Sequence, residues 1–414
     1  MLIIKKIRIV EENIKMNIGF VSSWLHRGAT YVTINYMKML SQNNLYVYAR
    51  GGEYFDGSFE FENTVIYKAK RLEGTKIDFK EFIKWIKKNN ISIVIVNEQD
   101  EVEAICEAKL HCPEVIFGAY IDYYTEKTVK NYLAYDFLIC NTKRHYDVFK
   151  WHPQCFYLPW CVDTELYKPI VKREKEISFF HSMGMSDRKG TDILIKTFIK
   201  YKLGEKSKLI IHTQKNISNI LSEKEAKKNN IIIIEKTVSA PGLYYLGDIY
   251  VYPTKLDGLG LTMYEALSSG IPVITTDDAP MNEIIENDRG KLVKVNKFIS
   301  RSDGYYWPLA YISERDLFEK MKFYIENPEI LEKEKVNARH YALDNLKIEL
   351  CKKRLNSIVS TLYTIDNKKW CEDYLFDVKK QRKIFKKHEI VDLFIPKFLE
   401  SKIREKRENK RRSK

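Results

Sequence analysis

The sequence predicts an α/β protein of two Rossmann-like domains, each a doubly wound parallel sheet covered by helices. Short apolar runs alternate with amphipathic helical segments along most of the 414 residues, a pattern typical of parallel βαβ units. The alternation occurs twice, over residues 16–160 and 176–345, with a proline-containing stretch at 159–169 between the two halves. Two domains of this kind favour a ligand site in the cleft between them.

The first half opens with a strand and a helix, and later alternates buried apolar runs with a second and a third helix. The helix at 78–90 places Phe79, Phe82 and Trp85 on one face. The apolar runs are short and rich in β-branched residues, as strands buried on both faces of a parallel sheet are. The predicted strands are 16–21, 44–49, 91–97, 114–120 and 136–141, and the predicted helices are 29–40, 78–90 and 145–153.

The second half repeats the plan with longer apolar runs. Its first helix, 191–203, has Leu194, Phe198 and Tyr201 on one face. The pattern from 314 to 362 is helical throughout. The predicted strands of this half are 177–182, 208–213, 230–236, 248–254, 272–277 and 290–295.

The stretch from Asp257 to Pro272 is the most informative part of the chain. Two carboxylates, Asp257 and Glu265, lie eight positions apart, and a turn with two glycines lies between them. A glycine turn that leads into a helix leaves backbone N–H groups without acceptors, which suits a phosphate. The turn follows one predicted strand and precedes another, where parallel sheets bind ligands. The spacing alone fits an ordinary βαβ turn equally well.

This stretch resembles the donor-site signature of the retaining glycosyltransferases of family 4, which have the GT-B fold. The signature joins an acidic residue, a Gly-x-Gly turn and a glutamate eight positions later to a Gly-x-Pro-Val strand. The resemblance covers roughly residues 160–290. Other segments match in the same order: 162–169 between the domains, the Arg188-Lys189-Gly190 run, Tyr245, Asp248, Pro253 and Thr254 before the turn, and Glu283 after the next strand.

The resemblance implies a role for each matching residue. Lys189, with Arg188, is expected beside the leaving diphosphate, since bond cleavage develops negative charge there. Glu265 is expected to accept hydrogen bonds from the ribose, and Asp257 to contact the transferred sugar. The backbone of the glycine turn is expected to bind phosphate, through Gly258, Leu259, Gly260, Leu261 and Thr262. Without the resemblance, Lys189 reads as a surface lysine and Glu265 as a residue that balances the helix dipole.

The chain departs from the family pattern at three places. Asp257 stands where the family has a glutamate, and Met185 follows Gly184 where the family has an arginine. The family histidine that faces the cleft has no counterpart, so Asp122 is expected to replace it, or the role is absent. His145 is expected to be a surface or half-buried histidine.

The loop 22–30 is expected near the donor phosphate and the acceptor. His26, Arg27 and Gly28 in this loop fit an anionic acceptor or phosphate, and they fit a plain surface loop equally well.

The domains are expected at 1–165, which binds the acceptor, and 166–344, which binds the donor. Helices at 345–378 are expected to pack back on the first domain, and 379–414 is a basic tail.

The tail carries 15 Lys and Arg against 5 Asp and Glu, so ten of the fourteen net positive charges lie in it. It fits a segment that docks on an anionic membrane surface and, equally, a helix packed on the first domain.

Composition excludes several other classes of protein. The confinement of the basic charge to one end argues against a nucleic-acid partner. Seven cysteines without a Cys-x-x-Cys pair indicate a reducing compartment and no zinc site.

We expect no bound cofactor and no metal, with a nucleotide-diphosphate sugar as co-substrate. A cytoplasmic location, with possible attachment to the inner face of a membrane, is expected, and Met16 is a second candidate start.

The sequence therefore predicts a retaining hexosyltransferase, with a glycan, a lipid-linked molecule or a protein as acceptor. A nucleotide-sugar epimerase shares the two-domain plan and needs no second substrate. A non-catalytic GT-B protein that binds a glycan or a partner fits the three departures from the family pattern.

Overall fold

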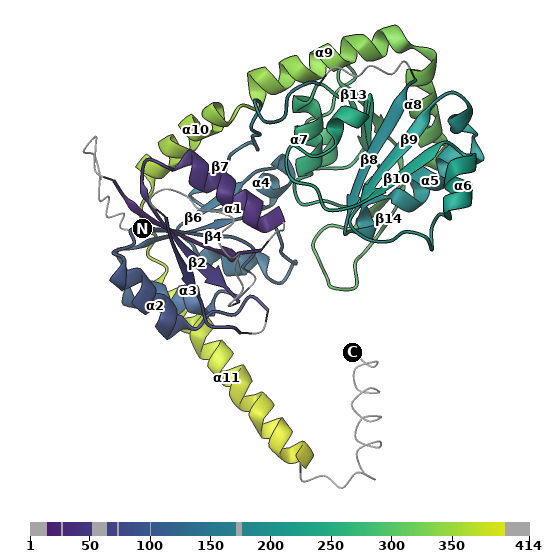
Figure 1. The fold of residues 1–414 in the computed structure, drawn as a ribbon. Coiled ribbons are helices and arrows are strands. Elements are labelled where there is room, and N and C mark those ends of the chain that lie inside the picture. The colour runs from purple at the N-terminus through teal and green to yellow at the C-terminus, as the bar shows by residue number, and fades with distance from the viewer. Residues whose placement is uncertain are drawn as a thin grey trace.

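The computed structural model describes residues 15–25, 28–51, 64–72, 74–99, 101–170 and 176–393, with side chains described as far as residue 382. Two sheets, each flanked by helices, lie at opposite ends of the body, and the chain crosses from one to the other twice (Figure 1). Apart from a short hairpin, every strand pair is parallel. The chain therefore has the two Rossmann-like domains that the repeated alternation predicts.

The first sheet has seven strands. Its central strands are buried on both faces, which explains their uninterrupted apolar runs. Two edge strands were missed, one because its residues are mostly exposed and one because it has three residues. The spatial order is β3 (Thr64–Lys68), β2 (Asn44–Arg50), β1 (Asn17–Ser23), β4 (Ile93–Val96), β5 (Ile116–Tyr120), β6 (Phe137–Cys140) and β7 (Cys155–Tyr157).

Helices cover both faces of this sheet. The Asp78 carboxylate caps α2 by accepting hydrogen bonds from the N–H groups of Lys80 and Glu81. One face packs in a core cluster with α1 (Gly28–Met39) and α10 (Ile348–Thr361). The other packs with α2 (Phe79–Lys88), α3 (Glu103–His111), α4 (Lys143–Phe149) and α11 (Lys368–Leu393).

The second sheet has six strands. Helices α5 (Thr191–Lys200), α6 (Glu223–Lys228) and α8 (Glu314–Glu326) share a core cluster on one face. Helices α7 (Leu261–Ser268) and α9 (Pro328–Asn345) pack on the other face. The spatial order is β10 (Ile231–Glu235), β9 (Lys208–Thr213), β8 (Ser178–Gly184), β11 (Ile249–Tyr252), β12 (Val273–Thr276) and β13 (Gly290–Val293).

An antiparallel hairpin that the sequence pattern did not predict joins the two domains. It consists of β14 (Val295–Ile299) and β15 (Leu309–Ile312). Its loop reaches the first domain, where Tyr305 stacks on Tyr123 with ring centroids 5.1 Å apart and the Tyr306 N–H donates to the Tyr124 carbonyl at 3.0 Å. The hairpin fixes the second domain against the end of β5.

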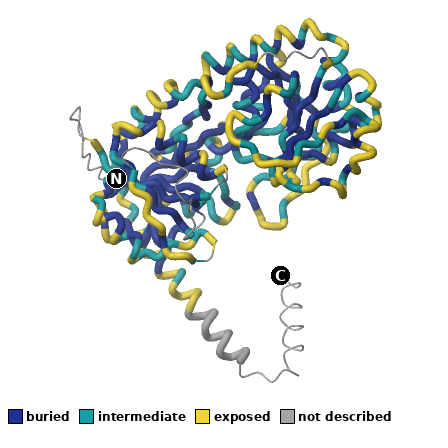
Figure 2. The backbone as a smooth tube through the Cα atoms, viewed as in Figure 1, coloured by how far each residue is buried: buried dark blue, intermediate teal, exposed yellow. Residues whose placement is uncertain are grey.

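Buried residues run through both sheets and along the helices that connect them (Figure 2). One core cluster includes residues of both domains, from Ile18 in β1 to Met281 after β12. The cleft edges of the two sheets are therefore held by a shared apolar core as well as by polar contacts.

Helix α11 extends from the first domain (Figure 1). Its start is anchored by the buried side chains of Cys371 and Leu375, and Arg382 pairs with Glu103 of α3. The helix itself is described to residue 393 and its contacts with the first domain to Arg382, so both expectations for the rest of the tail stay predictions. Residues 394–414, which hold Pro396 and most of the basic tail, lie outside the described residues. Within the described chain, no helix is both long enough and apolar enough to span a bilayer.

Candidate active site in the cleft

The turn between β11 and α7 is the candidate donor-binding turn, called the donor turn below, and it is organised by Asp257. Its Oδ1 accepts hydrogen bonds from the backbone N–H groups of Leu259 at 3.3 Å and Gly260 at 3.0 Å. Its Oδ2 accepts hydrogen bonds from Lys189 Nζ and the Tyr252 hydroxyl. Burial opposes ionisation, but the charge of Lys189 and these hydrogen bonds outweigh it, so the pKa of Asp257 lies well below its ordinary value. Asp257 is therefore an anion whose oxygens are engaged within its own turn.

Lys189 reaches this turn from the loop after β8. Its ammonium lies 4.7 Å from the centre of the Tyr252 ring. The next residue, Gly190, has φ +75°, and a Cβ there would lie 2.0 Å from the Pro253 carbonyl oxygen. Only glycine fits that position, which fixes the path of the chain beside the turn. Because the Lys189 side chain is 20% exposed, its charge remains accessible to a ligand.

The structure narrows the expected phosphate-binding amides. The spacing predicted the backbone of residues 258–262, but Asp257 already accepts from two of these N–H groups. The Met263 N–H donates to the Gly260 carbonyl at 2.9 Å. The N–H groups of Leu261 and Thr262 belong to the first turn of α7, where helix geometry provides no acceptor. These two amides and the Gly258 N–H, to which Asp257 is not bonded, suit a phosphate in this structure.

Glu265 lies one turn further along α7 and is held by two tyrosines. Its Oε1 accepts from the Tyr167 hydroxyl at 3.0 Å, and its Oε2 accepts from the Tyr244 hydroxyl. Burial raises the pKa of Glu265, and these two hydrogen bonds partly oppose that shift. A carboxylate has about four acceptor positions, so Glu265 keeps capacity for ligand hydroxyls.

Arg188 lies at the rim of the cleft. Its backbone carbonyl accepts from the Lys255 N–H at 2.7 Å and from the Thr254 hydroxyl at 3.2 Å, while its side chain is exposed. The positive charge of Arg188 acts on Asp122 of the other domain. Arg188 thus lies between the two domains, on the side of the donor turn.

Asp122 faces the donor turn from the first domain, just after β5. A Cβ added at Gly258 would lie 2.3 Å from Asp122 Oδ1, so the carboxylate lies directly against that glycine. Burial and the negative charges of Glu98 and Asp257 raise the pKa of Asp122 to about 7, against a smaller opposing effect of Arg188. The domains thus bring together Asp122 and Asp257, which are far apart in the sequence.

His145 does not lie on the surface, as the sequence suggested, but is 1% exposed. Its Nε2 lies 3.2 Å from the Gly258 carbonyl oxygen, which only accepts, so Nε2 carries the proton. Its Nδ1 then accepts from the Tyr124 hydroxyl at 2.9 Å, and that oxygen accepts from Trp307 Nε1 at 2.7 Å. Burial and the Arg144 charge lower the pKa of His145 to about 3, which keeps it neutral.

Glu283, which also matched the family pattern, bridges the domains. Its carboxylate accepts from the backbone N–H groups of Lys143 at 2.6 Å and Arg144 at 2.8 Å, at the start of α4 in the first domain. Arg144 also pairs with Asp278 at 2.6 Å. Glu283 therefore has a structural role in holding α4, and with it His145, against the second domain.

The loop before α1 is only partly described. His26 and Arg27 lie outside the described residues, so their expected role near the acceptor stays a prediction. Gly28 begins α1 and has open space around it. The Thr30 hydroxyl donates to the Ser23 carbonyl at 2.9 Å, which closes the loop at its base.

Sequence reasoning missed the tyrosines that hold the two donor-side carboxylates. Tyr244 and Tyr252 come from a short helical turn and from β11, and no local motif marks them. Tyr167 lies in the matched linker 162–169, so that linker was the available signal. Strand alternation places Tyr250 and Tyr252 on one face of β11, where their rings stack at 5.6 Å.

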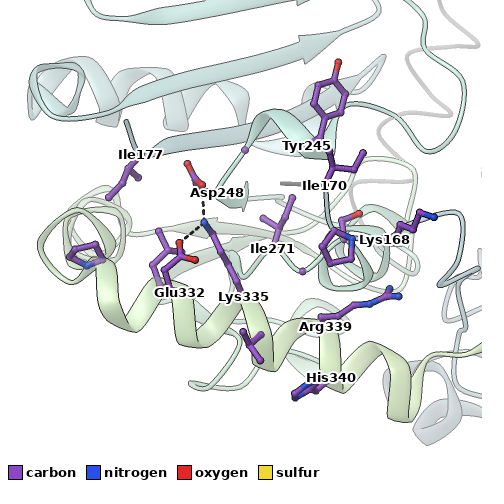
Figure 3. Close-up of a pocket in the computed structure, with 17 residues that line it drawn as sticks. Lys168, Ile170, Ile177, Tyr245, Asp248, Ile271, Glu332, Lys335, Arg339 and His340 are labelled. Atoms are coloured by element: carbon purple, nitrogen blue, oxygen red, sulfur yellow. Dashed lines mark hydrogen bonds and ion pairs between the residues drawn. The ribbon is translucent and has the colours of Figure 1, made fainter. Parts of the chain in front are cut away.

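A separate cavity of about 600 Å³ lies at the opposite ends of the strands, between α9 and the start of β11 (Figure 3). Its central group is Lys335, which pairs with Asp248 at 2.9 Å and with Glu332 at 2.7 Å. These three charged groups thus neutralise one another, and Arg339, which also lines the cavity, donates to the Tyr167 and Ser268 carbonyls.

No cluster of three or more His, Cys, Asp or Glu side chains arranged to hold a metal ion occurs within the described ranges. Lys189 is a cation that contacts the donor turn directly, through Asp257.

Comparison with known proteins shows which family model part of the chain matches and which solved structures share its fold. Residues 163–302 match the family model "Glycosyl transferases group 1". Anabaena HepE in complex with UDP aligns over 84% of this chain and 100% of its own, with a TM-score of 0.65 and 13% identity. Sucrose-phosphate synthase from Thermosynechococcus elongatus aligns over 83% and 98%, with a TM-score of 0.64 and 12% identity. The lipopolysaccharide core mannosyltransferase LpsB of Rhizobium meliloti is 32% identical over 68 residues, which span 16% of this chain and 19% of LpsB. The fold is GT-B.

Proposed function

We propose that this chain, whose residues 163–302 belong to the glycosyl transferases group 1 family, transfers a sugar from a nucleotide-diphosphate sugar to an acceptor hydroxyl with retention of configuration. The observation that carries the proposal is the donor turn. Lys189 contacts the turn before α7, two N–H groups lie in the first turn of α7, and Glu265 lies one turn further along, in the order that a diphosphate and a ribose require.

The diphosphate would bind between Lys189 and the first turn of α7. Lys189 is paired with Asp257, so its charge is already placed where a leaving phosphate needs it and no reorganisation is required. The ribose would bind to Glu265, whose position is fixed by two tyrosines. UDP is the first nucleotide to try, because the Anabaena structure of the same fold contains it.

The acceptor hydroxyl would attack the anomeric carbon from the side of the first domain. As the bond between that carbon and the diphosphate breaks, Lys189 stabilises the charge that develops on the leaving oxygen. The leaving diphosphate oxygen takes the proton from the acceptor hydroxyl. This transfer neutralises both the negative charge on the leaving group and the positive charge on the attacking oxygen. The hairpin loop and Glu283 hold the domains together, and a bound donor would complete the exclusion of water from the reacting groups.

The acceptor would be a glycan, a lipid-linked molecule or a protein, and the transfer would proceed without a metal ion. Full activity in excess EDTA would support transfer without a metal ion, and loss of activity restored by Mg²⁺ would contradict it.

The basic tail would bring the enzyme to an anionic membrane surface. Co-sedimentation with phosphatidylglycerol vesicles, lost on removal of residues 394–414, would support that placement.

Calorimetry with UDP-, GDP- and ADP-sugars tests the donor site. Wild-type protein should bind one nucleotide class, and Glu265→Ala and Lys189→Ala should fold normally and lose that affinity. Unchanged affinity in both variants would contradict the site. Conversion of the donor alone to an epimer would favour an epimerase, and binding without turnover across an acceptor panel would favour a binding protein.

A further inference from the structure

The carboxyl edge of the first sheet carries a second group of polar side chains, opposite the donor turn. Tyr120 ends β5, Asp122 follows it two residues later, and Glu98 follows β4, the neighbouring strand. The carboxyl ends of parallel strands meet at one edge. These three side chains therefore gather at the cleft on the first-domain side.

Tyr120 is the unusual member of this group. The residue is 6% exposed, and its hydroxyl makes no hydrogen bond with any residue that the structure describes. Burial, then the charges of Asp122, Tyr36 and Glu98, raise the pKa of Tyr120 well above its ordinary value. The residue is buried, but its hydroxyl is not one of the fully buried polar atoms that lack a partner. The hydroxyl therefore reaches accessible space, where a ligand can accept its hydrogen bond.

The backbone that presents Glu98 is held in a strained conformation. Glu98 has φ +51°, a region that L-residues seldom adopt. Its carbonyl accepts a hydrogen bond from Arg50 Nη1 at 2.7 Å, and the same nitrogen donates to Gln99 Oε1 at 2.7 Å. The surrounding residues thus maintain this backbone conformation, and the Glu98 charge acts on Asp122.

The opposite side of the group is closed by the hairpin. The Tyr305 hydroxyl donates to the Asp122 carbonyl at 3.2 Å, and the Tyr305 ring stacks on Tyr123. Asp122 Oδ1 lies against Gly258 of the donor turn. A hydroxyl group bound at Asp122 would therefore lie next to the site where the donor sugar is expected.

We propose that Tyr120, Glu98 and Asp122 form the acceptor subsite, and that it selects an uncharged, hydroxyl-rich acceptor such as a sugar or polyol over a phosphorylated one. This inference rests on the proposed transferase function. The two carboxylates accept hydrogen bonds from acceptor hydroxyls, and the Tyr120 hydroxyl donates to an acceptor oxygen. A phosphate in the same place meets two like charges at short range. The buried phenol distinguishes this site from a mere group of acidic residues.

Calorimetry on the full-length protein tests the subsite. The protein is first saturated with whichever of UDP, GDP or ADP binds, and is then titrated with glucose and glucose 6-phosphate, and with mannose and mannose 6-phosphate. The neutral sugar of at least one pair should bind at least tenfold more tightly than its phosphate. Tyr120→Phe should weaken that binding at least tenfold, with nucleotide affinity unchanged.

Two further variants sharpen the outcome. Glu98→Lys should reverse the preference within each sugar pair, because it replaces one carboxylate by a cation. Tyr36→Phe is the matched control. The Tyr36 hydroxyl donates to Asn141 at 2.8 Å and its ring lies 6.1 Å from that of Tyr120, so this variant removes a neighbouring phenol and should leave the preference unchanged.

The results separate two failures. Equal or tighter binding of the phosphorylated sugars, no binding of any sugar, or unchanged binding in Tyr120→Phe would each overturn the acceptor subsite. Absence of nucleotide binding would instead overturn the proposed transferase function. Because the Tyr120 hydroxyl has no partner among the described residues, Tyr120→Phe should fold, and circular dichroism checks this.

Discussion

The two edges of the cleft differ in how their charges are neutralised. On the donor side, Asp257 has Lys189 and Tyr252 as partners, and two tyrosines hold Glu265. On the opposite side, burial and then the like charges of Glu98 and Asp257 raise the pKa of Asp122 to about 7. The donor edge is thus organised by its own side chains, whereas the acceptor edge is electrostatically unsatisfied until a ligand supplies hydrogen-bond donors.

This difference gives each edge its own response to substitution. Removal of a donor-side group leaves a partner unpaired, so affinity and stability should fall together. Removal of the Asp122 charge relieves the cost of burying it beside like charges. Stability should therefore rise while function falls, as is common at functional sites.

The largest effect is expected for Lys189→Ala. The variant removes the cation beside the leaving diphosphate and leaves Asp257 without its charged partner. The turnover number should fall by about 10²–10³-fold, the loss typical for removal of one such group. Steady-state kinetics with the donor identified by calorimetry measures this. Lys215→Ala is the control, because Lys215 pairs with exposed Asp187, and it should retain turnover within about twofold.

Gly258→Ala should disturb both edges at once. The added methyl group would lie 2.3 Å from Asp122 Oδ1, so the domains must separate or the turn must shift. Overpacking of this kind costs about 1–3 kcal/mol, measurable as a lower free energy of unfolding in urea. Gly28→Ala, where a Cβ meets open space, should leave stability nearly unchanged. Equal stability of the two variants would mean that Asp122 does not lie against the turn.

Asp122→Asn should stabilise the protein at neutral pH. The folded pKa of Asp122 is about 7, above the ordinary 3.8, so its stabilising contribution is complete below pH 3.8 and is lost as the pH rises through 7. Against wild type, the variant should gain about 2 kcal/mol at pH 7.5 after solvent screening, and almost nothing at pH 4.

Urea unfolding at both pH values measures this difference. Asp147→Asn, which alters an exposed carboxylate paired with Lys150, should change stability by less than about 0.5 kcal/mol. A gain that is the same at pH 4 and pH 7.5 would show that ionisation of the buried Asp122 carboxyl is not its source.

The smallest effect is expected for Tyr167→Phe. It removes one of the two hydroxyls that hold Glu265, at 3.0 Å, while Tyr244 still donates to the other oxygen. Stability should fall by about 1 kcal/mol, and donor affinity should fall several-fold. Thermal unfolding and calorimetry measure both changes. Tyr245→Phe, an exposed neighbour of Tyr244, should change neither, and a loss in both variants would point to a general defect of this region.

Most of the fold was predictable from the sequence. The buried strands β1, β4 and β11 appear as continuous apolar runs because helices cover both faces of each sheet. The edge strands and the β14–β15 hairpin were missed, since exposed or very short strands lack an apolar run.

What the sequence by itself determined is the donor turn, because Asp257, two glycines and Glu265 act within one continuous segment where spacing sets geometry. Only the tertiary structure brought Asp122 against Gly258, placed Glu283 on α4 and buried His145 beside the turn. These contacts join residues more than a hundred positions apart. Their distances and charges follow from how two sheets pack, which no local pattern encodes.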